Sequence, residues 1–179
     1  MEQRQNITCT TEIDVVGNII SAIGYKKRIF PIGRLDKMSE GLILLTSDGD
    51  IVNKILRAEN THDKEYLVTV NKPLNSQFIE KMASGVPILG TTTLPCKINM
   101  QGQFMFKIIL TEGLNRQIRR MCEYLDYRVT KLKRIRIMNV SLDVPHGTYR
   151  DLTKEELDEI ERLTSESTKE YLKEKKSLK

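Results

Sequence analysis

The chain has 179 residues, of which 39% are hydrophobic and 30% are charged, and its formal net charge is +5. This length is typical of one domain, and no segment approaches the ~18 consecutive apolar residues of a membrane span. The polar start MEQRQNITCTTE lacks the apolar core of a signal peptide, and three widely spaced cysteines predict neither a disulfide framework nor a zinc cluster. Secreted, membrane-embedded and zinc-structured classes are therefore excluded, which leaves the cytoplasm as the expected location.

Basic charge concentrates in one segment. Residues 112–136 contain eight lysines and arginines and three acids, so their net charge of +5 equals that of the whole chain. Such a local excess is typical of proteins that bind polyanions. A solvated basic surface is the commoner meaning of a moderate excess, so charge alone leaves both interpretations open.

The first part of the chain predicts short elements separated by turns. Residues 12–24 carry apolar positions at helical spacing. Residues 41–50, GLILLTSDGD, predict a buried strand that runs into a turn. Asp50 is a candidate N-cap for a short helix over residues 51–59, because its carboxylate can accept hydrogen bonds from first-turn amides.

The middle of the chain predicts strands around one helix. The alternating segment EYLVTV, residues 65–70, predicts a strand, and residues 86–111 predict several more. Between them a helix is expected over residues 76–84, with Asn75 or Ser76 as its cap.

The last part predicts a helix, a strand and a second helix. Residues 115–127 are strongly helical in pattern, and residues 131–142 alternate basic and apolar side chains, as a strand with one face toward a polyanion would. Thr153 and Glu156 form a capping box, which predicts a helix that ends near Leu163.

Strands and helices are mixed without a regular βαβ rhythm, and there is no glycine-rich phosphate loop. This pattern favours an α+β fold with a mixed or mainly antiparallel sheet over a doubly wound nucleotide-binding sheet. Two histidines and the lack of a G-x-S-x-G serine disfavour a Ser-His-Asp triad. A carboxylate is therefore the better candidate for a nucleophile or base.

The most specific stretch is PIGRLDKMSEGLILLTSDGD, residues 31–50, in which Asp36 lies two residues after Arg34. Taken alone, such an aspartate would more often be a turn residue. The stretch resembles the catalytic motif of the pseudouridine synthases, in which G-R-L-D precedes a glycine-led apolar strand. The resemblance implies that Asp36 is the catalytic aspartate.

Three further segments resemble motifs of the same family, in the same order. HDKEYLVTV, with Lys64 and Tyr66, is similar to the strand whose tyrosine stacks on the target base. EGLNRQIRRM is similar to the arginine motif of the subfamily that modifies ribosomal RNA, which implies that Arg119 pairs with the catalytic aspartate. KLKRIRIMNVSL is similar to the final motif, which implies a packing leucine at Leu132 and an RNA-facing Arg134.

The chemistry of these residues is consistent with that resemblance. A nearby cation favours the ionised form of a carboxylate, which can then act as a nucleophile or as a base. A tyrosine ring can stack on an extruded base, which is worth about 1–3 kcal/mol. Alone, however, Tyr66 would more often be a half-buried strand residue, and Arg119 a solvated or ion-paired helix residue. The predicted catalytic residues are Asp36, Tyr66 and Arg119, and the predicted RNA-binding residues are Arg34, Lys64, Arg116, Arg120, Leu132 and Arg134.

The resemblance also implies an architecture and a partner. We expect a curved, mainly antiparallel or mixed sheet with helices and a basic cleft, acting as a monomer on ribosomal RNA, 23S above all, without cofactor or metal. Residues 1–164 would form the catalytic domain, lacking the S4-type RNA-binding domain and the N-K-P-x-G strand that usually precede it. Residues 165–179 would form a charged tail.

The implied reaction converts uridine to pseudouridine. The base is flipped, its glycosidic bond is cleaved with assistance from Asp36, and the uracil is reattached through carbon five. Whether Asp36 acts as nucleophile or base is left open by the sequence. Two alternatives are a non-catalytic RNA-binding remnant of the same fold and a basic structural protein of the ribosome.

Overall fold

The computed structural model describes the chain except residues 13, 50–51, 53–54, 56–61 and 178–179, and it gives only the backbone of residues 166–177. The predicted cap Asp50 and most of the helix expected over 51–59 lie outside the described residues. No described helix is both long enough and apolar enough to cross a membrane.

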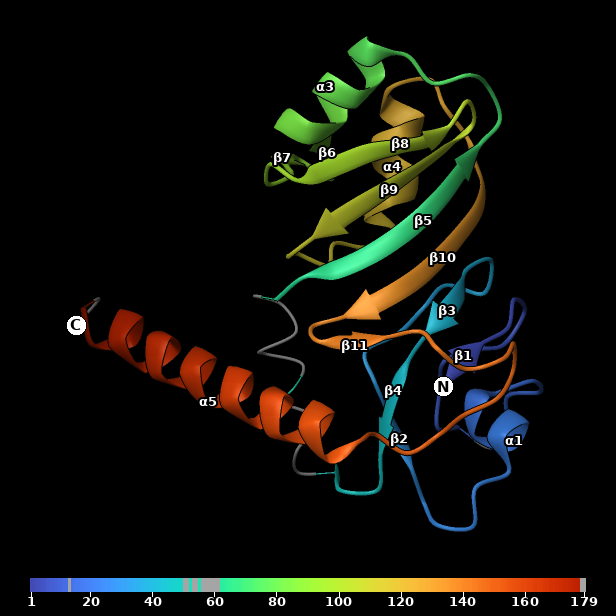
Figure 1. Ribbon diagram of the computed structural model, residues 1–179, viewed down its shortest axis with the longest axis vertical. Coiled ribbons are helices and arrows are strands. Elements are labelled where there is room, and N and C mark those ends of the chain that lie inside the picture. The colour runs from blue at the N-terminus through green and yellow to red at the C-terminus, as the bar shows by residue number, and fades with distance from the viewer. Residues whose placement is uncertain (13, 50–51, 53–54, 56–61, 178–179) are drawn as a thin grey trace.

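A mixed, mainly antiparallel sheet forms the centre of the described structure, as predicted (Figure 1). Its strand order is β1-β3-β10-β5-β9-β8, with β11 paired to β10, and only the β3–β10 pair is parallel. The strands are β1 (Glu2–Gln3), β3 (Glu40–Leu42), β5 (Lys64–Val70), β8 (Lys97–Gly102), β9 (Met105–Leu110), β10 (Val129–Ile137) and β11 (Val140–Ser141).

Two small antiparallel sheets accompany it. One joins β2 (Phe30–Ile32) to β4 (Leu44–Thr46), and the other joins β6 (Pro87–Ile88) to β7 (Thr91–Thr92). The segment predicted as a single strand over 41–50 is therefore two strands, β3 and β4, in different sheets. The change of sheet falls at Ile43, which is fully buried.

Gly41 permits the close approach of β3 to β10. Its φ is +116°, and a Cβ at this position would overlap the backbone of Arg134. Only glycine fits such a conformation and such a contact without strain. The glycine that opens the apolar strand in the G-R-L-D motif thus fixes where the loop carrying Asp36 joins the sheet.

Two helices pack against the sheet and enclose the larger core. They are α3 (Ser76–Ser84), which Asn75 caps as predicted, and α4 (Gln117–Tyr124). Alternation along β5 and β9 turns one row of apolar side chains toward these helices. The buried members of this core include Val68, Val70, Phe106, Ile108, Phe78, Met82, Ile118, Met121 and Cys122.

Helices α1 and α5 differ in length from their predictions. In the segment 12–24 the helix is only α1 (Ile19–Ile23), capped by Asn18 and ended by Gly24 in the left-handed conformation. The predicted capping box of α5 is confirmed, but α5 (Lys154–Ser177) continues well beyond residue 163. Figure 1 shows its far end pointing away from the sheet.

Candidate functional site

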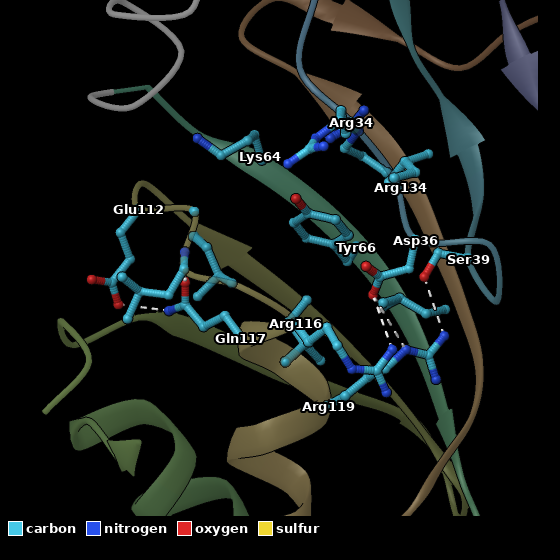
Figure 2. Close-up of a pocket in the computed structure, with 16 residues that line it drawn as sticks. Arg34, Asp36, Ser39, Lys64, Tyr66, Glu112, Arg116, Gln117, Arg119 and Arg134 are labelled. Carbon is cyan, nitrogen blue, oxygen red and sulfur yellow. Dashed lines mark hydrogen bonds and ion pairs between the residues drawn. The ribbon is translucent and has the colours of Figure 1, made fainter. Parts of the chain in front are cut away.

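A pocket of about 200 Å³ opens between the loop that follows β2, the start of β5 and the N-terminal end of α4 (Figure 2). It is smaller than the roughly 300–1,000 Å³ of sites for drug-sized ligands, so it suits one small group. Every predicted site residue except Arg120 lines it. The lining includes Arg34, Asp36, Ser39, Lys64, Tyr66, Glu112, Arg116, Gln117, Arg119, Leu132 and Arg134.

Asp36 faces two arginines from α4. Its Oδ2 lies 3.6 Å from Nη1 of Arg116 and 3.8 Å from Nε of Arg119. The Asp36 side chain is 33% exposed, so its carboxylate can meet a ligand that enters the pocket. A carboxylate in this position can attack carbon or accept a proton from a bound ligand.

The two arginines differ sharply in burial. The Arg119 side chain is 8% exposed, whereas that of Arg116 is 41% exposed. Burial, together with the neighbouring Arg116 cation, lowers the pKa of Arg119 from its ordinary value. Arg119 donates hydrogen bonds to the carbonyls of Met38 and Val129 and to Oγ of Ser39. It therefore ties α4 to the loop that carries Asp36.

Arg116 owes its place to an unusual backbone conformation. It is the N-cap of α4 with φ +51°, in the left-handed region, and its side chain makes no capping bond. The predicted helix over 115–127 therefore begins only at Gln117. This conformation costs about 1–2 kcal/mol in a residue with a Cβ. Arg120, expected beside Arg116, lies outside the pocket and bonds to Asn115 instead.

Strand β5 supplies one wall of the pocket. Lys64 and Tyr66 are two residues apart and thus on the same face as Val68, where Tyr66 packs at the edge of the larger core. Nζ of Lys64 donates to the carbonyls of Thr111 at 2.9 Å and His62 at 3.2 Å. Lys64 thereby joins β5 to the end of β9, and its contact with RNA stays a prediction.

Several side chains of strand β10 make contacts within the protein. Leu132 is buried, in agreement with its predicted packing role, but Arg134 is also buried and donates from Nε to the Leu42 carbonyl. Lys131 pairs with Glu40, and Lys133 pairs with Glu2. The positive charge of these two lysines is thus offset within the protein. Arg134 faces the pocket from inside the fold rather than from its surface.

Three polar residues of the pocket were not among the predicted site residues. Gln117 is buried and donates from Nε2 to Oε1 of Glu112 at 2.6 Å, while its Oε1 accepts from the Leu114 amide. Oε1 of Glu112 also accepts from the Leu94 amide. The third is Ser39, which bonds to Arg119. Glu112 and Gln117 belong to EGLNRQIRRM, but neither residue carries a signal of its own beside the arginines.

In the described part of the chain, no group of three or more His, Cys, Asp and Glu side chains is placed to hold a metal ion. The chemistry that the pocket offers is that of the Asp36 carboxylate with two guanidinium groups beside it, and of an aromatic ring.

Comparisons with known proteins agree with this arrangement. The family model for RNA pseudouridylate synthase matches residues 17–124. The dual-specificity RNA pseudouridine synthase RluF of Salmonella typhi is 58% identical over 165 residues, which are 92% of this chain and 57% of that protein. Ribosomal large subunit pseudouridine synthase B of Bacillus subtilis is 33% identical over 76% of this chain and 59% of that protein.

A solved structure is also similar. The crystal structure of a pseudouridylate synthase has a TM-score of 0.81 with 29% identity, over 89% of this chain and 71% of that chain. The segments HDKEYLVTV, GVPILGT and NRQIRRMCE predict particular similarity to large-subunit synthase F, and the identity to RluF confirms this prediction. The chain spans a little over half the length of these curated relatives.

Proposed function

Because the chain belongs to the RNA pseudouridylate synthase family, we propose that it isomerises a uridine of ribosomal RNA to pseudouridine, with 23S RNA as the first candidate. The observation that carries this proposal is the ionisable Asp36 held in a small pocket beside Arg116, Arg119 and Tyr66. We further propose that the protein acts as a monomer in the cytoplasm.

The reaction exchanges one bond for another. The bond between ribose C1′ and uracil N1 breaks, the base turns, and a bond forms between C1′ and C5. The proton on C5 leaves and N1 gains one, so substrate and product have the same composition. No oxidant or co-substrate is needed for this balance.

Each pocket residue has a role in this proposal. The uridine is extruded from the RNA, since its glycosidic bond cannot be reached within a stack. Tyr66 provides a surface on which the base stacks, and the carboxylate of Asp36 either attacks C1′ or removes a ribose proton. Arg119 holds the carboxylate in place through its ion pair. Arg34 and Arg116, which are the exposed arginines of the pocket lining, contact phosphates.

Turnover separates this function from a non-catalytic RNA-binding module. Purified protein is incubated with unmodified ribosomal RNA transcripts, and pseudouridine is then mapped along the RNA. Formation of several moles of pseudouridine per mole of protein, at one position of the RNA, supports the proposal. Tight RNA binding without any pseudouridine would support the non-catalytic module instead. Because the RluF relatives are described as dual-specificity enzymes, a second class of structured RNA is included.

A further inference from the structure

We infer that Ser39 is a positioning residue for the isomerisation, acting through Arg119; this inference rests on the proposed function. Ser39 lies in the loop between β2 and β3, three residues after Asp36, and is 1% exposed. Its hydroxyl oxygen accepts a hydrogen bond from Nη2 of Arg119 at 3.1 Å (Figure 2). The hydroxyl is therefore hydrogen-bonded to a guanidinium group that faces the reacting carboxylate.

The orientation of Arg119 follows from its acceptors. Nη2 donates both to Ser39 Oγ and to the Met38 carbonyl, the latter at 2.8 Å. These acceptors take up Nη2 and leave Nε as the nitrogen that faces Asp36, at 3.8 Å from Oδ2. A planar guanidinium with its outer nitrogen fixed at two points cannot rotate about its stem without breaking one of them.

This orientation keeps the Asp36 carboxylate usable. Arginine and carboxylate groups prefer a bidentate pair, in which two parallel N–H groups occupy both carboxylate oxygens. Such a pair would engage both oxygens and make each less available to the ribose. Because Ser39 and Met38 hold Nη2, Arg119 supplies its charge to Asp36 through a single, longer contact.

Ser39 also fixes the backbone of Asp36. The amide of Ser39 donates to the Asp36 carbonyl at 2.9 Å, which closes the turn between the two residues. One residue thus holds the carboxylate through its amide and the guanidinium through its hydroxyl. Since Ser39 has almost no exposed surface, it offers little area for RNA, and its influence has to pass through these two groups.

The test compares kcat with KM for ribosomal RNA. Ser39→Ala keeps the amide and loses the hydroxyl, so kcat should fall about tenfold or more while KM changes by less than about twofold. Ser39→Thr keeps a hydroxyl acceptor and should restore most of kcat. Ser84→Ala is the matched control, because Ser84 Oγ bonds only to helix carbonyls on the exposed side of α3. It should leave both constants unchanged.

A double-mutant cycle tests the route through Arg119. Arg119→Lys keeps the charge but has no Nη2, so Ser39→Ala on that background should cause no further loss of kcat. Equal fold-losses on both backgrounds, or an unchanged kcat in Ser39→Ala alone, would overturn the inference.

The same double-mutant cycle, measured by urea unfolding, needs no RNA. It separates failure of the Ser39–Arg119 contact from failure of the proposed function. If the contact exists, the two changes together should shift the unfolding equilibrium constant by less than the product of their separate effects. A purely multiplicative result refutes the Ser39–Arg119 contact. An inactive wild-type protein that still shows the coupling refutes the proposed function while retaining the contact.

Discussion

Replacing Arg119 by alanine should be far more damaging than replacing Arg116, although both guanidinium groups lie within 4 Å of Asp36. Arg119 is buried, and its removal deprives Met38 and Ser39 of their donor as well as Asp36 of a cation. Removing one partner of a buried ion pair costs about 3–5 kcal/mol. Because water reaches the 33% exposed Asp36, we expect the lower end, about 3 kcal/mol.

Arg116 is the matched comparison. The Arg116–Asp36 pair is open to solvent on both sides, and solvent-exposed ion pairs contribute about 0–1 kcal/mol, so Arg116→Ala should change the free energy of unfolding by no more than that. Arg116→Gly should even offset this loss, because glycine adopts the left-handed conformation without the Cβ penalty. The free energies of unfolding are measured in urea.

Activity should follow the same order. A loss of about 3 kcal/mol in the transition state corresponds to a rate lower by about 100-fold or more, which is the expectation for Arg119→Ala. Arg116→Ala should lose about tenfold or less. Both are assayed on ribosomal RNA at a temperature where the variants are folded. Equal losses of stability and activity in the two variants would show that the pairing has been assigned to the wrong arginine.

Three further predictions concern the fold, the RNA surface and the thiols. Gly41→Ala should destabilise the protein by about 3 kcal/mol or more, measured in urea, because its Cβ would overlap the backbone of Arg134; a loss below 1 kcal/mol contradicts the close approach. Lys131 and Lys133 are already paired with carboxylates. Replacing both by alanine should therefore change the slope of log RNA affinity against log salt concentration by less than about one unit. A change of about 1.5 units would mean that both lysines contact phosphate. Burial raises the pKa of Cys96 to about 11. The thiol of an unfolded chain ionises near pH 8.5, so above that pH the unfolded state releases a proton that the folded state keeps. The free energy of unfolding should therefore fall by up to about 1.4 kcal/mol per pH unit. Cys96→Ala should lack this contribution when urea titrations at pH 8 and pH 10 are compared.

The residues of the site could be predicted from the sequence, but their geometry could not. Asp36, Tyr66 and Arg119 come from distant segments, and their motifs were enough to place all three in one pocket. Motifs carry residue identity and order, but not backbone conformation. Nothing in NRQIRR indicates that Arg116 adopts a positive φ or that the helix starts at Gln117 rather than at residue 115.

The charges of strand β10 also could not be interpreted from the local sequence alone. Lys131 and Lys133 alternate with apolar residues, as a polyanion-binding strand would. Their partners, Glu40 and Glu2, lie far earlier in the chain and meet them only because β3 pairs with β10 and β1 pairs with β3. Local charge counts cannot include a carboxylate that tertiary structure brings in. Whether β10 presents a basic face to RNA therefore stays a prediction.

The most direct test of the account follows the hydrogen that isomerisation must release. Ribosomal RNA is transcribed with tritium at C5 of uridine, and tritium release is measured with wild-type protein and with Asp36→Asn. Because the new bond forms at C5, wild-type protein should release tritium from one uridine in each RNA over many turnovers. Asp36→Asn should release none, while its RNA affinity and urea midpoint stay close to those of the wild type. Multiple turnover by Asp36→Asn, or no release by a wild-type protein that binds the RNA, would contradict the central assignment.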